Sequence, residues 1–95
     1  MKKILVTGCA GFIGFNLCRS LLTKNSKNKI YGVDNINNYY DINLKKNRLK
    51  ILKKEINFKF TKIDLVNYSK LNNLFKNNKI DYVINIAAQA GVRYS

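Results

Sequence analysis

A glycine-rich segment near the start of the chain constrains the fold more than any other feature. Residues 7–14, TGCAGFIG, follow the apolar run at 4–6 and open a helical pattern. Gly8 suits a tight turn, Gly11 suits the approach of main-chain amides to a pyrophosphate, and Gly14 suits close packing of helix on strand. The helix that begins here also directs the positive end of its dipole toward an anion. The segment therefore predicts a strand, a phosphate-binding turn and a helix.

A second strand supplies an acidic residue at a matching distance. Residues 30–33, IYGV, lead into Asp34, which follows Gly14 by twenty positions. A carboxylate at this place accepts hydrogen bonds from both hydroxyls of an adenosine ribose and repels a 2′-phosphate. The pattern thus predicts a dinucleotide site, with NAD favoured over NADP. The competing interpretation is a flexible turn with Asp34 capping a loop, and it does not account for strand, spacing and helix together.

Composition and charge restrict the remaining choices. The chain has 95 residues, of which 46% are hydrophobic, so it has room for one domain or part of one with a real core. Its net charge of +13 invites a nucleic-acid partner, since clustered cations release counterions from phosphate backbones. The lysines, however, are scattered over predicted helix faces and turns instead of forming one patch studded with aromatic residues. We therefore expect no nucleic-acid partner.

The cysteines and the first residues bear on location. Cys9 and Cys18 have no metal or redox spacing, and the chain has no histidine. We expect no metal site and interpret both cysteines as small apolar residues in a reducing interior. The apolar stretch after the charged start is too short for a signal peptide, and no stretch has the length of a membrane span. These features predict a cytoplasmic protein without a membrane partner.

Hydrophobic periodicity alternates between short apolar runs and helical spacing, in the order β-α-β-α-β-α-β. Helical stripes are expected at Ile13, Leu17, Cys18, Leu21 and Leu22, then at Ile42, Leu49, Leu52 and Ile56, then at Tyr68, Leu71, Leu74 and Phe75. The lysines of the second stripe are expected on a solvated face.

The last two predicted strands differ in character. The strand at 58–63 is expected at an edge, with Lys59 and Lys62 facing away from Phe58 and Phe60. The strand at 82–86 is expected to be buried on both faces.

Right-handed crossovers between these elements predict a parallel, Rossmann-type α/β sheet of order 3-2-1-4 with helices on both faces. A ligand then binds at the carboxyl ends of the strands. The candidate site residues all follow those ends: residues 8–14, Asp34, Asp64 and residues 87–95.

Several motifs together resemble the extended short-chain dehydrogenases. They are TGxxGFIG at 7–14, VDN at 33–35, NYYD at 38–41, DL at 64–65 and AAQAGVRYS at 87–95. The last is similar to nucleotide-sugar epimerases, especially those that act on UDP-glucuronate. Asn85 stands where such enzymes often carry a histidine, so a local packing contact is expected to differ.

The resemblance implies roles for individual residues. The expected NAD contacts are Gly8, Gly11, Phe12, Ile13, Gly14, Asp34, Asn35, Asp64, Leu65, Ala87, Ala88 and Gln89. Asp64 alone is equally suited to capping the next turn. Arg93 offers a planar fork for the carboxylate or phosphate of a sugar nucleotide, or for a surface ion pair.

In these epimerases a tyrosine, helped by a lysine four residues later, removes the proton of the sugar's C4 hydroxyl while NAD takes the hydride. No tyrosine of this chain has a lysine at that spacing. We therefore interpret residues 1–95 as the N-terminal part of an NAD-binding Rossmann domain, without the substrate domain and without catalytic residues. The enzyme that the resemblance implies inverts C4 of a UDP-sugar, with UDP-glucuronate favoured, and is expected to form a homodimer at full length. A 4,6-dehydratase or reductase on the same fold and a non-catalytic NAD-binding module stay open.

Overall fold

The computed structural model describes residues 2–24, 27–35, 42–64 and 67–86. In chain order these residues form β1 (Lys3–Thr7), α1 (Phe12–Lys24), β2 (Lys29–Asp34), α2 (Ile42–Leu52), β3 (Phe58–Lys62), α3 (Tyr68–Asn78) and β4 (Tyr82–Asn85). The alternation of strands and helices expected from the periodicity is confirmed.

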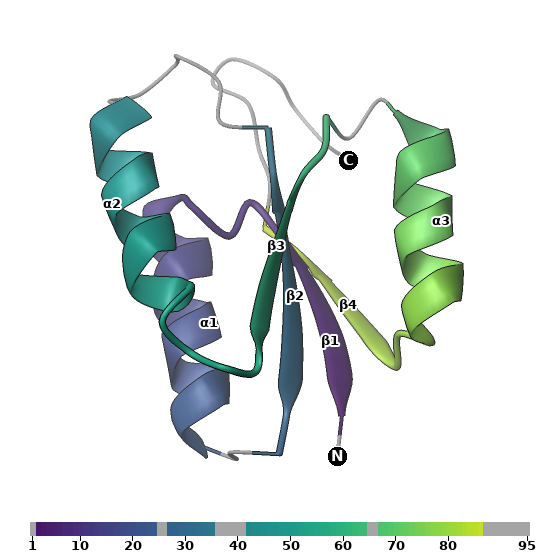
Figure 1. Ribbon diagram of the computed structural model, residues 1–95, viewed down its shortest axis with the longest axis horizontal. Coiled ribbons are helices and arrows are strands. Elements are labelled where there is room, and N and C mark those ends of the chain that lie inside the picture. The colour runs from purple at the N-terminus through teal and green to yellow at the C-terminus, as the bar shows by residue number, and fades with distance from the viewer. Residues whose placement is uncertain (1, 25–26, 36–41, 65–66, 87–95) are drawn as a thin grey trace.

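The strands form one parallel sheet in the order β3-β2-β1-β4 (Figure 1). Thr7 pairs with Val33 on one side and with Asn85 on the other, and Asp34 pairs with Lys62. The carboxyl ends of the strands therefore meet at one edge of the sheet. The predicted Rossmann-type class, the strand order and the edge position of β3 are all confirmed.

The sheet has helices on both faces, with α1 and α2 on one and α3 on the other (Figure 1). Side chains alternate along β1, so Ile4 and Val6 belong to a different buried cluster from Leu5. The cluster under α1 and α2 contains Ile4, Val6, Cys9, Ala10, Phe15, Cys18, Ile30, Leu49, Leu52 and Phe58. The cluster under α3 contains Leu5, Tyr31, Val33, Ile63 and Ile80.

The helical stripes are confirmed in their centres and wrong at their ends. In α1 the side chain of Cys18 is buried, but Ile13 is exposed and Phe15 is buried in its place. The second helix ends at Leu52, so Ile56 lies in the turn that follows and is 92% exposed. Helical periodicity does not continue past the end of a helix, which explains the error at Ile56.

Two expectations about the edge strands are also wrong. Lys62 shares a face of β3 with Phe60, because residues two apart point to the same side of a strand. In β4 the side chains of Tyr82 and Val83 are about half exposed, not buried. Among the described residues β4 pairs with β1 alone, so it is an edge strand and lacks a neighbour that would cover it.

Candidate dinucleotide-binding site

The chain turns sharply after β1. Gly8 has a φ of 73°, in the left-handed region that glycine adopts without strain. Its N–H donates to the carbonyl oxygen of Val33 at 2.7 Å, and the N–H of Cys9 donates to the same oxygen at 3.3 Å. These bonds hold the start of the loop against the end of β2, as the predicted tight turn requires.

Gly14 and Gly11 have different reasons to lack a side chain. A Cβ at position 14 would lie 2.1 Å from the carbonyl oxygen of Gly8, so the close approach of α1 to the loop depends on glycine there. A Cβ at position 11 would meet the same oxygen at 3.4 Å, an ordinary van der Waals contact. The protein itself thus has room for a side chain at Gly11. The approach of a ligand to this position stays a prediction.

The first turn of α1 contains amides without an internal partner. The N–H groups of Gly8 and Cys9 donate to β2, the N–H of Gly11 donates to the Gly8 carbonyl at 3.1 Å, and the N–H of Phe15 donates to the Gly11 carbonyl at 2.9 Å. The amides of residues 12–14 have no backbone acceptor among the described residues. Donors of this kind, at the positive end of a helix dipole, bind phosphate oxygens. The diphosphate is therefore expected at residues 12–14 in particular.

The carboxylate of Asp34 lies beside this loop and is only 4% exposed. Its Oδ2 accepts a hydrogen bond from the Ala10 N–H at 3.1 Å, and its Oδ1 lies 3.2 Å from Nζ of Lys45. Among the described residues this is the one ion pair. Asp34 joins β2, the glycine loop and α2.

Lys45 and Arg48 of α2 contact Asp34 and the loop respectively, and the sequence pattern alone does not predict either contact. The Lys45 side chain is 10% exposed, contrary to the solvated face expected for this helix. Nη1 of Arg48 donates to the carbonyl oxygen of Ala10 at 3.1 Å, and its guanidinium lies 5.9 Å from the centre of the Phe12 ring. Both polar groups of Ala10 are therefore bonded to side chains. The helical period could have indicated these contacts, because it places Lys45 and Arg48 on the same side of the helix as Leu49 and Leu52.

The remaining described candidates lie at the same edge. Phe12 and Ile13 are 70% and 65% exposed, so their side chains are not part of the core. Asn35 directly follows Asp34 and is half-buried. The N–H of Ile63 donates to the Asp34 carbonyl at 3.2 Å and so brings Asp64 to the end of β2.

Asp64 lies at the turn that leads from β3 to α3. The N-cap of α3 itself is Asn67, whose side chain accepts a hydrogen bond from the Lys70 N–H at 3.2 Å. Asp64 contributes its main-chain carbonyl, which accepts from the Asn67 N–H at 2.8 Å. Capping of this turn by the Asp64 side chain and contact with adenine both stay predictions.

Asn85 makes a specific contact at the end of β4. The hydroxyl of Thr7 donates a short hydrogen bond to Oδ1 of Asn85, across the pair of strands β1 and β4. This contact ties the last residue of β1 to β4 beside the glycine turn. The amide thus has a defined local role at the position where the resembling enzymes often have histidine.

Cys9 and Cys18 are buried free cysteines, as expected for small apolar residues. Burial raises the pKa of the Cys18 thiol to about 12, and burial also raises the pKa of the Cys9 thiol far above its usual range. Both side chains are therefore neutral thiols at neutral pH, and neither is a nucleophile there.

Several candidates lie outside the described residues. They are Leu65, Ala87, Ala88 and Gln89 for the cofactor and Arg93 for the substrate. Their roles stay expectations from the resemblance. In the part of the chain that the structure describes, no helix has the length and apolar character needed to cross a membrane.

The parallel sheet of order 3-2-1-4, the glycine turn after β1 and the acidic end of β2 define a Rossmann-type dinucleotide-binding domain of the short-chain dehydrogenase class. The family model for GDP-mannose 4,6 dehydratase matches residues 5–95. The chain belongs to this family, and the resemblance to extended short-chain dehydrogenases that act on nucleotide sugars is confirmed.

Individual relatives agree with this assignment. UDP-glucuronate 4-epimerase from Thermodesulfobacterium geofontis is 48% identical over 95 residues, which are 100% of the chain and 29% of the relative. The crystal structure of UDP-glucuronic acid 4-epimerase from Bacillus cereus with UDP-glucuronic acid and NAD has a TM-score of 0.81 and 40% identity, over 96% of this chain and 28% of that one. A dTDP-glucose 4,6-dehydratase from Bacillus anthracis, solved with NAD, has a TM-score of 0.84 and 29% identity, over 95% and 28%. The chain thus spans less than a third of the length of these relatives.

Proposed function

We propose that this chain is the NAD-binding portion of a nucleotide-sugar epimerase that inverts C4 of a UDP-sugar, with UDP-glucuronate as the favoured substrate. The observation that carries the proposal is the combination of unbonded amides at residues 12–14 with the carboxylate of Asp34 held at the end of β2. The first group suits a diphosphate and the second a ribose.

Each part of the site has a definite task in this proposal. The amides of residues 12–14 bind the diphosphate oxygens, and Gly11 leaves the space through which those oxygens approach. Asp34 accepts hydrogen bonds from the adenosine ribose. Lys45 and Arg48 keep the carboxylate and the loop in place before the cofactor arrives, so less ordering is needed on binding.

When bound, NAD would supply a reversible acceptor for the hydride from C4 of the sugar. The resulting 4-keto sugar could rotate, so that the hydride returns to its opposite face. This chain contributes cofactor binding and orientation. Proton transfer at the C4 hydroxyl needs a Tyr-x-x-x-Lys pair, which the 95 residues do not contain.

The choice of epimerase over dehydratase is supported by the relatives. This chain is 48% identical to the UDP-glucuronate 4-epimerase of Thermodesulfobacterium geofontis and 40% identical to the Bacillus cereus epimerase solved with UDP-glucuronic acid and NAD. Its identity to the solved dTDP-glucose 4,6-dehydratase is 29%. The motifs at 38–41 and 87–95 favour the same choice. A 4,6-dehydratase is the second candidate, because dTDP-D-glucose 4,6-dehydratase from Dictyostelium discoideum is 40% identical over 92 residues.

The NAD site can be tested by replacing Gly11 with alanine. The added methyl group meets the Gly8 oxygen at an ordinary contact distance, so the fold should be kept, while the group intrudes on the expected ligand. Titration calorimetry should show NAD binding to the parent chain and at least about a tenfold weaker affinity in Gly11→Ala, equivalent to about 1.4 kcal/mol. The control Ser20→Ala, at an exposed position later in α1, should bind like the parent.

The ribose contact needs a variant that leaves no buried charge behind. Asp34→Ala combined with Lys45→Met removes the acceptor together with its cation. A folded double variant should lose NAD affinity, whereas unchanged binding would refute the role of Asp34. Absence of NAD binding by the folded parent chain would refute the whole proposal. Assays with UDP-glucuronate and dTDP-glucose on a polypeptide that also supplies the Tyr-x-x-x-Lys pair then distinguish epimerase from dehydratase.

A further inference from the structure

A basic groove lies between α2 and β3, on the face of the sheet that α1 and α2 cover. Its volume is about 430 Å³, within the range of sites for small ligands. Two apolar side chains and four lysines line it, namely Leu49, Phe60, Lys46, Lys50, Lys53 and Lys62. The described residues that line it include no acid. We call this feature the lysine groove.

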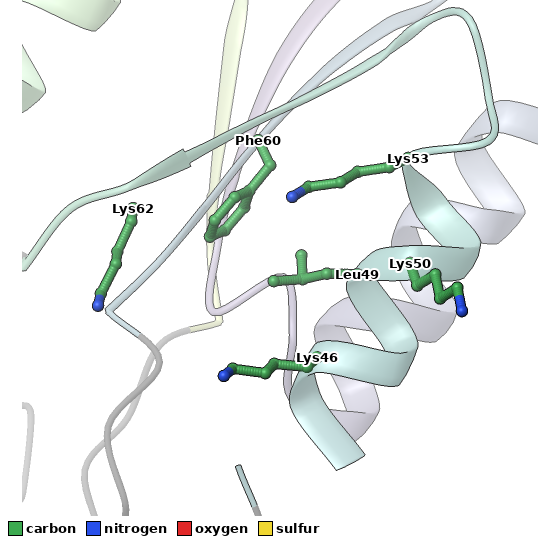
Figure 2. Close-up of a pocket in the computed structure, with 6 residues that line it drawn as sticks. All are labelled: Lys46, Leu49, Lys50, Lys53, Phe60 and Lys62. Carbon is green, nitrogen blue, oxygen red and sulfur yellow. The ribbon is translucent and has the colours of Figure 1, made fainter. Parts of the chain in front are cut away.

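The centre of the groove is apolar. Leu49 belongs to the buried cluster under α1 and α2 and is 5% exposed. Phe60 lies on the same face of β3 as the buried Phe58 and is itself half-buried. Figure 2 shows the side chains of Leu49 and Phe60 in the space between the helix and the strand. A ligand of this groove therefore needs an apolar middle.

Two lysines of α2 lie on either side of this apolar centre. Lys46 and Lys53 both extend from α2 toward β3, and Leu49 projects between them (Figure 2). Lys53 follows Lys46 by seven positions, which corresponds to about 10 Å along a helix axis. Lys50 lies between them in the sequence but extends away from β3 (Figure 2). The groove thus presents a cation, an apolar floor and a second cation in line.

Both cations are available to an anion. The ammonium of Lys53 lies 5.4 Å from the centre of the Phe60 ring, which attracts it without neutralising its charge. Neither Lys46 nor Lys53 forms an ion pair within the described part of the chain. Lys62, at the carboxyl end of β3, adds positive charge at the end that Lys46 borders. An anionic group at each end of a ligand would balance these charges.

We propose that the lysine groove binds a small dicarboxylate with an apolar chain, with one carboxylate on Lys46, the other on Lys53, and the chain on Leu49 and Phe60. Each carboxylate gains charge-assisted hydrogen bonds from an ammonium group. The chain gains from the removal of apolar surface from water. The competing interpretation is a set of solvated lysines whose alkyl parts cover the apolar floor, and it gives no preference for any ligand.

This site is separate from the proposed cofactor site. It uses α2 and β3, whereas the dinucleotide is expected on the amides of residues 12–14 and on Asp34. The ammonium of Lys45, not that of Lys46, lies 3.2 Å from the Asp34 carboxylate. The dicarboxylate and NAD should therefore bind at the same time, and the inference does not depend on the proposed function.

The test is a length series of anions, titrated into the chain and followed by nuclear magnetic resonance of its labelled backbone amides. Azelate has a carboxylate at each end of an extended chain that matches the spacing of the two lysines. Succinate is too short to bridge them, and octanoate has a similar chain with a single carboxylate. Because the second carboxylate of azelate binds within the same complex, azelate should bind at least about tenfold more tightly than either.

Variants identify the lysines that are responsible. Lys46→Gln and Lys53→Gln each remove one anion contact, so each should weaken azelate by about tenfold, to the affinity of octanoate. The matched control Lys50→Gln removes the same charge from the same helix and should keep azelate affinity within about twofold. Circular dichroism confirms that each variant is folded.

The outcomes decide this inference independently of the proposed function. Equal affinities for azelate, succinate and octanoate, or no binding of azelate, overturn it. Equal losses in Lys50→Gln and Lys46→Gln also overturn it, because they show attraction by overall charge. Displacement of azelate by NAD would place azelate in the cofactor site and overturn it as well. Binding of azelate without binding of NAD refutes the proposed function alone.

Discussion

The two faces of the sheet are held to their helices in different ways. On one face α1 and α2 contribute Gly14, Phe15, Cys18, Lys45, Leu49 and Leu52 as buried residues. On the other face α3 contributes none, although Leu71 and Leu74 are half-buried against the sheet. The two faces differ in polar contacts as well as in packing, since Lys45 ties α2 to Asp34 at the end of β2 and Arg48 ties α2 to the glycine loop.

This contrast indicates that the two faces of the sheet contribute differently to stability and to cofactor binding. Close packing of α1 and the ion pair from α2 fix the positions of the amides and the carboxylate that the proposed cofactor needs. Helix α3 is capped at both ends, by the Asn67 side chain and by Lys79 in a left-handed conformation, but it carries no described candidate residue. We therefore expect the α1 and α2 face to control both stability and ligand binding, and the α3 face to control neither strongly.

The largest effect is expected for Gly14→Ala. The new methyl group would lie 2.1 Å from the Gly8 oxygen and 2.8 Å from its carbonyl carbon, so α1 has to move away from the loop. Overlap with backbone cannot be relieved by a side-chain rotation, and we expect a loss of more than about 4 kcal/mol in the free energy of unfolding. Urea denaturation followed by circular dichroism measures this loss. Gly11→Ala is the control, and a loss of equal size there would contradict the steric argument.

Lys45→Met should have the next largest effect. Methionine keeps much of the volume but leaves the Asp34 carboxylate buried without its cation. Breaking a buried ion pair by removing one partner costs about 3–5 kcal/mol. The measurement is again urea denaturation, with Lys70→Met on α3 as the matched control, which should change stability by less than about 0.5 kcal/mol because Lys70 is exposed.

A double variant tests whether the loss of stability in Lys45→Met comes from the unpaired Asp34 carboxylate. Adding Asp34→Ala to Lys45→Met removes the unpaired charge and should recover part of the lost stability. No recovery would indicate that Lys45 stabilises α2 by packing alone.

The sequence was sufficient for the features that depend on local spacing. Gly8 and Gly14 have the predicted turn and close packing, and Asp34 ends the second strand as expected. Short apolar runs and helical stripes were enough for the strand order because parallel strands joined by helices have few allowed topologies.

The predictions that are wrong concern features that depend on contacts between distant segments. Because lysine is usually solvated, its residue type predicts a polar face for Lys45, and only the proximity of Asp34 explains its burial. Tyr82 and Val83 resemble an interior strand in composition, but exposure depends on which strands and helices lie beside β4. The position of Lys62 is different in kind, since the two-residue period of a strand by itself predicts that Lys62 and Phe60 share a face.

A direct comparison of the two faces comes from equal truncations. Leu52 in α2 is 1% exposed, while Leu74 in α3 is half-buried. Leu52→Ala should cost about 2–5 kcal/mol through lost burial and a cavity, whereas Leu74→Ala should cost about 1 kcal/mol. Denaturation midpoints with unchanged m-values would measure both. Equal costs would show that the α3 face is packed as firmly as the other.

The smallest effect is a loss of stability in alkali, arising on the α1 and α2 face. Burial raises the pKa of the Cys18 thiol from 9.0 to about 12. Between these values the unfolded chain releases a proton that the folded chain keeps, so the unfolded state binds fewer protons and the free energy of unfolding falls as pH rises. The contribution of this thiol is fully present below the lower of these two pKa values and is lost as pH rises toward the higher one.

Other groups also titrate in alkali, so the test is a difference between two chains. The free energy of unfolding should fall between about pH 8 and about pH 10.5, and it should fall less in Cys18→Ala, which has no thiol to ionise when unfolded. The variant starts from lower stability because it loses buried sulfur, but its slope against pH should be shallower. Identical slopes would mean that the folded state exposes this thiol, and with it the interior beneath α1, and the contrast between the two faces would then be weaker than the packing indicates.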